Sequence, residues 1–274
     1  MIEIPESLVL AEQLNKTVNG KKIVSVETEH TEHKFAWYEG DPQKYDEKMA
    51  GQVIGRCTGI GSMVEIEVGE YSFVAGDGTN IRYYDAGEKL PERYQTRIVF
   101  EDGSSLLCTV QMYGSMFLII SQEYENPYYL AAKQKPMPGT EVFDYPYFCT
   151  LAQGLSKGTS AKAFLATEQR IPGLGNGVLQ DILLESGIHP KRKILTLSDE
   201  DFRCLYDTTV RLLTEMKNAG GRNTEKTLFG EAGGYETKLS RKNIGYCPHC
   251  GGPITKMAYL GGTVYFCSTC QPLD

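Results

Sequence analysis

The sequence predicts an α+β, multidomain fold with a mostly-β front part, a helical middle part and a small cysteine-rich end. Three observations support this division. Apolar residues alternate or run over strand lengths up to about residue 125, and later they recur with a helical period. Four prolines interrupt residues 126–146. The last 30 residues carry two Cys-x-x-Cys pairs, and 274 residues are enough for more than one domain.

The front part, residues 1–125, is expected to begin with a short strand-like piece at Ile2–Ile4 and then a helix. Pro5 suits a first helical position, because its missing N–H has no intrahelical partner there. Apolar residues then recur every four positions until Gly20, which ends the pattern as a left-handed cap would. Several segments of strand character follow, and the Asp102-Gly103 pair between two of them predicts a hairpin.

Residues 126–146 are interpreted as a linker, and residues 147–243 as a helical domain. Within that domain the segment VLQDILLES is closed by Gly187, and DEDFRCLYDTTVRLLTEMK is long enough for a five-turn helix. Ser198 and the acidic residues after it suit the positive end of that helix. Residues 219–243 are polar and rich in glycine, which predicts a surface loop.

The charge of −7 is distributed unevenly along the chain. Residues 1–150 hold 13 basic and 23 acidic side chains, whereas residues 151–274 hold 15 and 12. The rear half is therefore the better candidate for meeting a polyanion. No run of 18 apolar residues indicates a membrane span, and the opening MIEIPESLVLAEQ lacks the basic region of a secretory signal. A cytoplasmic location is expected.

The terminal module, residues 244–274, has the spacing of a metal site. Cys247-x-x-Cys250 and Cys267-x-x-Cys270 stand 16 residues apart, with a predicted hairpin between them that turns at Gly261-Gly262. Two such pairs complete a tetrahedral zinc site, and four thiolates leave no open position for a catalytic water. Disulfides or a redox pair are the alternatives, but export is not indicated. We therefore expect structural zinc.

A second pattern, PGLGN, precedes a predicted helix. Its glycines allow positive φ and close approach of backbone, and free N–H groups at a helix start attract anions. Gly175 and Asn176 are therefore candidates for holding a phosphate. A tight turn between two helices with an asparagine cap explains the same residues, and this stretch alone leaves both interpretations open.

These motifs, taken together, resemble the formamidopyrimidine-DNA glycosylase and endonuclease VIII family. The shared features, in order, are the opening MIEIPE, the PGLGN turn followed by GIHP, and the terminal cysteine pairs followed by Gln271. The resemblance implies a β-sandwich with a leading helix at residues 1–125, a helix–two-turn–helix DNA-binding domain at 147–243 and a zinc finger at 244–274. Members of the family flip an oxidised base out of the duplex and excise it. Their N-terminal proline attacks the sugar C1′, a Schiff base forms, and elimination nicks the strand.

The resemblance also implies roles for individual residues. Glu3 matches the catalytic glutamate, and Glu6 matches the second glutamate of the opening motif. Asn176 matches a phosphate-contacting asparagine, with Gly175 beside it. Arg222 and Lys226 give positive charge to the Gly-rich loop, which stands where the family carries a lesion-covering loop. The zinc ligands are expected to be Cys247, Cys250, Cys267 and Cys270.

Several family positions are changed in this chain. Ile2 replaces the nucleophilic proline, and such a large second residue should leave Met1 in place, so the Met1 α-amine becomes the candidate nucleophile. An α-amine keeps a useful neutral fraction near neutral pH. Other catalytic, wedge and phosphate-binding positions of the family align with uncharged or acidic residues here, namely Gly61, Asp77, Gln111-Met112 and Gly262.

The expected function is base-excision DNA repair by a damaged-base DNA glycosylase with AP-lyase activity. Either the Met1 amine attacks the sugar or Glu3 activates water. The alternative is a catalytically inactive damaged-DNA-binding protein on the same scaffold, and a zinc-stapled protein-interaction module would fit the net charge of −7. The expected partner is damaged or abasic double-stranded DNA, with no membrane, and the protein is expected to be a monomer associated with the nucleoid.

Overall fold

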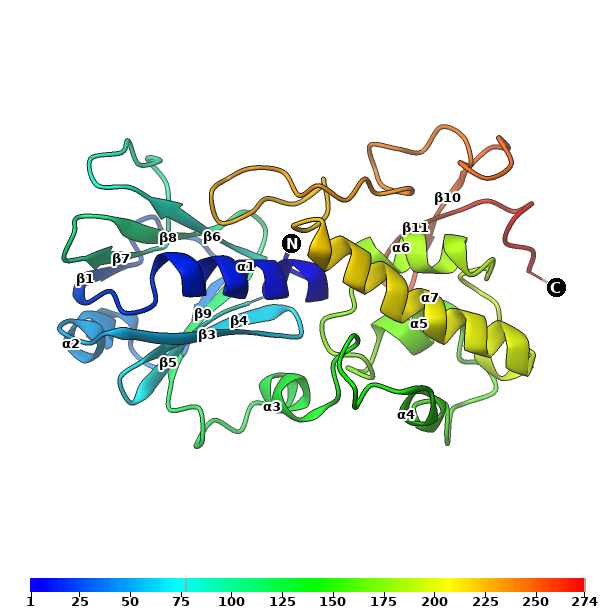
Figure 1. The fold of residues 1–274 in the computed structure, drawn as a ribbon, viewed down its shortest axis with the longest axis horizontal. Coiled ribbons are helices and arrows are strands. Elements are labelled where there is room, and N and C mark those ends of the chain that lie inside the picture. The colour runs from blue at the N-terminus through cyan, green and yellow to red at the C-terminus, as the bar shows by residue number, and fades with distance from the viewer. Residues whose placement is uncertain (77, 274) are drawn as a thin grey trace.

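The computed structural model describes residues 1–76 and 78–273, so Asp77 lies outside the described residues. Two bodies lie side by side along the long axis of the molecule (Figure 1). Two sheets form the front body, and helices with a terminal hairpin form the rear body. The α+β fold and its β-sandwich are therefore as the sequence predicts.

The front body is a sandwich of a four-stranded and a five-stranded sheet. The strand orders are β1-β7-β8-β6 and β2-β9-β5-β4-β3, with β2 parallel to β9. The predicted hairpin at Asp102-Gly103 joins β7 to β8, with Gly103 at φ +82°. The strands are β1 Ile23–Thr28, β2 Ala36–Tyr38, β3 Ile54–Ile60, β4 Met63–Val68, β5 Tyr71–Gly76, β6 Thr79–Tyr84, β7 Thr96–Phe100, β8 Ser105–Val110 and β9 Gly114–Ile119. A 3₁₀ turn, Pro42–Lys44, and the short helix α2, Tyr45–Met49, follow β2.

Helix α1, Ile4–Thr17, connects the two bodies. Its first residue, Ile4, is fully buried in the core of the rear body, whereas Leu10 and Leu14 pack in the sandwich core. The strand predicted at Ile2–Ile4 is wrong. Glu3 is the N-cap of the helix, so residues 1–3 are irregular and Ile4 is already helical.

The segment 126–146 is more ordered than the predicted linker, because it contains helix α3, Pro127–Gln134. The Asn126 side chain caps this helix by accepting hydrogen bonds from two backbone N–H groups. Lys133 and Tyr129 then donate to the carboxylate of Glu65 on β4, at 2.7 and 2.8 Å. This contact holds α3 against the sandwich.

Helices α4 to α7 build the rear body around one apolar core. The predicted five-turn helix is α7, and the Ser198 side chain caps it by accepting from the N–H of Asp201. Gly187 has φ +67° just after α6, as the sequence predicts. The elements are α4 Tyr145–Thr150, α5 Ala161–Ala166, α6 Asn176–Glu185, the 3₁₀ turn Ile194–Thr196 and α7 Asp199–Asn218.

The Gly-rich segment 219–243 is a loop, as predicted, but it is tied to the front body. It extends from α7 across α1 toward β6 and then returns to the terminal hairpin (Figure 1). Leu228 is fully buried in the sandwich core, and its N–H donates to Gln13 of α1. Its carbonyl accepts from the N–H of Tyr83 on β6. The loop therefore bridges the two bodies.

The terminal hairpin pairs β10, Thr255–Tyr259, with β11, Gly262–Phe266. Its turn is Leu260-Gly261, one residue earlier than predicted, because Gly262 is already paired with Tyr259. Both turn residues have positive φ, which suits a two-residue hairpin turn. None of the helices in the described residues is long and apolar enough to cross a membrane.

Candidate active site

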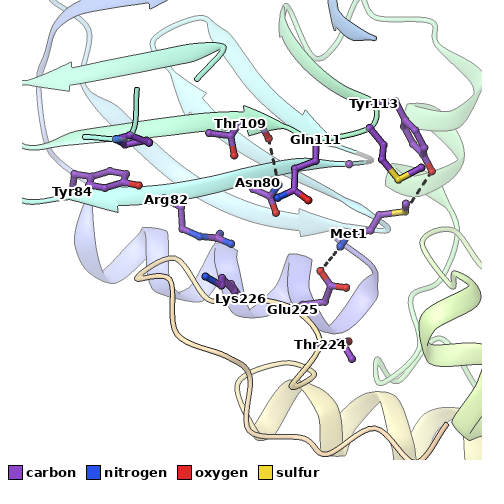
Figure 2. Close-up of a pocket in the computed structure, with 13 residues that line it drawn as sticks. Met1, Asn80, Arg82, Tyr84, Thr109, Gln111, Tyr113, Thr224, Glu225 and Lys226 are labelled. Carbon is purple, nitrogen blue, oxygen red and sulfur yellow. Dashed lines mark hydrogen bonds and ion pairs between the residues drawn. The ribbon is translucent and has the colours of Figure 1, made fainter. Parts of the chain in front are cut away.

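A cavity of about 510 Å³ lies where the sandwich, the N-terminus and the Gly-rich loop meet. Strands β6 and β8 supply one wall and the Gly-rich loop supplies the other (Figure 2). Its lining is mixed, and the polar part includes the cations Arg82 and Lys226, the carboxylate of Glu225 and the uncharged hydrogen-bonding residues Asn80, Thr109 and Gln111. Such a cavity suits a polar, partly anionic guest better than an apolar one.

The amine of Met1 projects into this cavity. Ile2 is 5% exposed and packs in the sandwich core, so it anchors the chain start, while Met1 itself is 47% exposed. The α-ammonium group forms an ion pair with the carboxylate of Glu225, from the Gly-rich loop (Figure 2). Tyr113 contacts the Met1 sulfur at 3.5 Å. The amine is therefore held in a defined place and can be reached from the cavity.

Glu3 is buried in the interior of the protein. Its two carboxylate oxygens accept hydrogen bonds from the N–H groups of Gly177 and Val178, at 2.8 and 2.9 Å. Burial raises the pKa of Glu3, and the nearby Arg222 guanidinium and these two N–H groups offset part of that effect. With 5% exposure and both oxygens engaged, Glu3 does not face the cavity as a free base.

Arg222 is buried instead of exposed, which corrects the prediction that it contacts DNA. Its guanidinium binds both carboxylate oxygens of Glu6, at 2.9 and 2.6 Å, and lies 3.5 Å from Glu3. It also donates to the carbonyl of Met1 at 3.4 Å. Burial acts to lower the pKa of Arg222, but the two glutamates outweigh burial and raise that pKa above its ordinary value. The Arg222 side chain is only 2% exposed, so it is a charged interior clasp between the loop and the N-terminus.

The glycines at the start of α6 make room for this cluster. A Cβ on Gly175 would lie 2.6 Å from the Glu3 carboxyl carbon, and a Cβ on Gly177 would lie 1.8 Å from the Arg222 guanidinium. The helix start does hold an anion, as the sequence suggests, but the anion is the Glu3 carboxylate. The predicted phosphate cradle at Gly175 is thus occupied by a side chain of the same protein.

Asn176 faces the terminal hairpin. Its Nδ2 donates to the carbonyl of Thr263 at 2.7 Å, beside Gln180, which donates to the same oxygen at 3.0 Å. Its Oδ1 is buried and has no hydrogen-bond partner among residues 1–76 and 78–273. Gly262 is close by, since a Cβ there would lie 3.6 Å from the Asn176 amide. Helix α6 and the hairpin thus meet at the position predicted to contact phosphate.

The four predicted metal ligands form a single cluster. All four sulfurs lie within 4.8 Å of one another, with 3.7 Å between Cys247 and Cys270 and 3.5 Å between Cys250 and Cys267. Four zinc–sulfur bonds of about 2.3 Å in a tetrahedron place the sulfurs about 3.8 Å apart. The cluster therefore fits a four-thiolate zinc ion. His249 is outside it and pairs with Glu185 at 2.7 Å.

Two charged residues of the cavity, Glu225 and Arg82, were not predicted from the sequence. Glu225 and Arg82 belong to no motif, and they come together only because the loop folds back onto β6. Lys226 was named from its charge alone, and it does line the cavity. Gly61, which aligns with a lysine of the resembled family, packs closely against the Gly173 turn. A large apolar side chain, Met112, is 71% exposed at the rim.

Comparison with known proteins agrees with this architecture over the whole chain. The chain is 26% identical over 282 residues to the formamidopyrimidine-DNA glycosylase of Streptococcus pneumoniae strain R6, with all of both chains covered. It is 29% identical over 282 residues to that of Halalkalibacterium halodurans, covering 99% of this chain and all of the other. The enzyme of Bacillus subtilis shows 27% identity over 279 residues, with 99% of each chain covered.

Solved structures show the same fold. The crystal structure of Lactococcus lactis Fpg with abasic-site DNA superposes with a TM-score of 0.82 at 23% identity, covering 98% of this chain and 99% of the other. A mutant of that protein bound to DNA with a formamidopyrimidine lesion gives a TM-score of 0.84, with the same identity and coverage. No protein-family model matches the chain.

Proposed function

We propose that this chain, which is similar over its whole given length to formamidopyrimidine-DNA glycosylases, is a base-excision DNA glycosylase that acts on damaged or abasic double-stranded DNA. The observation that carries the proposal is the N-terminal amine in a polar cavity between the sandwich and the Gly-rich loop. Relatives of this name align with the whole chain, and a solved relative binds abasic-site DNA on the same fold.

The proposed chemistry uses the Met1 amine as the nucleophile in place of the family's proline. Ile2 is buried and anchors the chain, and the amine points into the cavity. Attack on the sugar C1′ of an extruded nucleotide releases the base, and loss of the C1′–O4′ bond then gives a Schiff base. The strand is nicked when the Schiff base undergoes β-elimination.

Water activation by Glu3 receives less support from the same geometry. A general base must reach the proton that it removes, and both Glu3 oxygens are engaged by backbone N–H groups in the interior. The proposed role of Glu3 is to fix the start of α1 against the start of α6. The corresponding role of Glu6 is to hold Arg222, and through it the loop.

The cavity supports the substrate class. Arg82 and Lys226 provide cations for a sugar–phosphate chain, and Asn80, Thr109 and Gln111 offer donors and acceptors for a base edge. We propose a second phosphate contact at Asn176, the position that matches the family's phosphate-contacting asparagine, where its Nδ2 also donates to the Thr263 carbonyl of the hairpin. This arrangement would grip the duplex across both bodies.

We further propose that the four-cysteine cluster binds one structural zinc ion. Cys247, Cys250, Cys267 and Cys270 would be its ligands, and the bound ion would hold the hairpin in its fold. Four thiolate ligands would leave no open coordination position for a catalytic water. A finger fixed in this way keeps the hairpin turn beside α6, where the duplex backbone is expected.

The test is base release and strand cleavage on duplexes that carry an oxidised purine or an abasic site. Release of the base, cleavage at the abasic site and a borohydride-trapped protein–DNA adduct are the expected results. Binding to lesion-bearing DNA without base release or an adduct would favour the catalytically inactive DNA-binding protein. Indifference to every duplex at low ionic strength would contradict both.

A further inference from the structure

We infer that Glu225 is the acid–base residue that serves the Met1 amine. The inference rests on the proposed function and identifies a catalytic residue within the same cavity. Three glutamates surround the chain start, and two of them are closed to the cavity. Glu3 and Glu6 are each 5% exposed and are bound by backbone N–H groups and by Arg222.

Glu225 differs from these two glutamates in its surroundings. Its carboxylate is 23% exposed, lines the cavity and contacts the Met1 ammonium directly. Figure 2 shows the two groups facing each other beneath strands β6 and β8, which carry Asn80 and Thr109. A group that takes a proton from a nucleophile must lie within hydrogen-bond reach of it, and Glu225 is the carboxylate that meets this requirement.

The loop geometry fixes Glu225 in this position. Its N–H donates to the carbonyl of Arg222 at 3.0 Å, and its own carbonyl accepts from Gly233 at 3.1 Å. Arg222 also donates to the carbonyl of Met1. A single buried residue therefore contacts both partners of the ion pair, Glu225 through its main-chain carbonyl and Met1 through its guanidinium, which makes Arg222 a positioning residue.

The proton balance of the step is simple. Glu225 takes one proton from the Met1 ammonium, which leaves a neutral amine. The nitrogen lone pair forms the bond to C1′ while the bond from C1′ to the base breaks, and its electron pair leaves with the base. The protonated Glu225 then gives its proton to the departing base, so the carboxylate is restored and the positive charge remains on the new C1′–N bond.

Other charged groups surround the pair and set the background for any pH profile. Arg82 comes from β6, and its charge acts on Glu225. Arg222 and Lys226 belong to the same loop, and Glu6 comes from α1. These groups lie near Glu225. Within the described residues, however, the ion pair that Glu225 forms is with the Met1 amine.

The experiment compares Glu225→Gln with Glu231→Gln, a matched change at an exposed glutamate of the same loop. The substrate is an abasic-site duplex, and the readout is the rate of borohydride trapping from pH 6 to pH 9. Removing a general base costs about 100-fold or more. We expect Glu225→Gln to lose about 100-fold at neutral pH and the deficit to narrow at alkaline pH, where solvent removes the amine proton. Glu231→Gln should match the wild type.

Two additional measurements separate catalysis from structure. Binding to a duplex with a tetrahydrofuran abasic analogue should remain within a few-fold in Glu225→Gln, and Glu225→Asp should restore part of the rate. Equal trapping rates in the two glutamine variants would overturn the inference. So would a rate deficit in Glu225→Gln that is the same at every pH and is accompanied by lost binding. In both cases an adduct formed by the wild type would still support the proposed function. Absence of any adduct in the wild type would instead refute the amine mechanism, and the inference with it.

Discussion

Arg222 shows how one buried charge can organise several parts of a site. It holds Glu6 through two hydrogen bonds, neutralises part of the charge on Glu3 and binds the carbonyl of Met1. Gly177 leaves the space that the guanidinium occupies. The cost of burying these ions is met only while every partner is present.

Replacing Arg222 by Met should therefore be strongly destabilising. Removing one partner of a buried pair costs about 3–5 kcal/mol, because the remaining charges are left unpaired. Urea denaturation measures the change in the free energy of unfolding. Lys16→Met is the control, since Lys16 pairs with Glu12 on the exposed face of α1, and this kind of pair contributes about 0.5 kcal/mol. Equal losses in the free energy of unfolding for the two changes would contradict the proposal that Arg222 holds the loop and the N-terminus together.

The start of the chain marks where sequence reasoning succeeded and where it failed. The opening MIEIPE gave Glu3 and Glu6 as a pair of special carboxylates, and both are buried at the junction of the two bodies. Their partner could not be predicted, because Arg222 is over 200 positions away and lies in a loop whose composition suggests solvent exposure. Glu225 was missed for the same reason.

At the scale of single elements, α3 is the clearest difference from expectation. The prolines of residues 126–146 suggested an irregular linker, but Pro127 follows Asn126, and this pair of residues starts a helix as readily as it breaks one. By contrast, α7 was predicted well, because its period, length and Ser198 cap all favoured the same structure. Hairpin turns were predicted to within one residue.

The docking of α3 predicts an acid-sensitive contact. Burial acts to raise the pKa of Glu65, but hydrogen bonds from Lys133 and Tyr129 outweigh it and lower that pKa below its ordinary value of 4.5. A carboxylate whose pKa is lower in the folded state stabilises that state at pH values above its unfolded-state pKa. The stabilisation is lost as the pH falls through the folded-state pKa. Glu65→Gln should therefore be less stable than the wild type at pH 7.

The difference between Glu65→Gln and the wild type should shrink once the pH falls below 4.5. Thermal unfolding between pH 3 and pH 7 measures it. Glu141→Gln, at an exposed glutamate, is the control and should follow the wild type throughout. A difference that stays constant over this range would show that the ionised form of Glu65 is not what holds α3.

The terminal hairpin gives a prediction about metal. We expect one zinc ion per chain, and Cys250→Ser should lower the zinc content and weaken duplex binding, because the hairpin loses the bonds that fold it. Metal analysis and a gel shift give the two values. Cys204→Ser, at an exposed cysteine outside the cluster, should retain both. A full zinc content in Cys250→Ser would exclude the four-thiolate site.

At the scale of the whole molecule, the two bodies meet at a close backbone contact. Gly173 has φ +80°, and a Cβ there would lie 2.1 Å from the carbonyl carbon of Gly61 in the front body. The carbonyl of Gly173 also accepts from the N–H of Ile4 at 3.1 Å. This contact sets the spacing between the sandwich and α6, and under the proposed function it would set the width available to a duplex.

Gly173→Ala should therefore disturb more than local conformation. A left-handed alanine costs about 1–2 kcal/mol by itself, and the steric conflict with Gly61 adds to this. Gly154→Ala is the control, because Gly154 has φ +72° and nothing within 4 Å. The free energy of unfolding and the affinity for an abasic-site duplex should both fall further in Gly173→Ala. Identical losses of stability and affinity in the two variants would mean that only the left-handed backbone conformation is disturbed, and not the contact between Gly173 and Gly61.

The identity of the attacking nitrogen tests the account most directly. The wild-type protein is trapped with borohydride on an abasic-site duplex, digested and mapped by mass spectrometry. We predict that the adduct lies on the N-terminal peptide and is attached to the α-nitrogen of Met1. An adduct on the side chain of Lys226, or on any other lysine, would contradict the proposal that the chain start performs the chemistry.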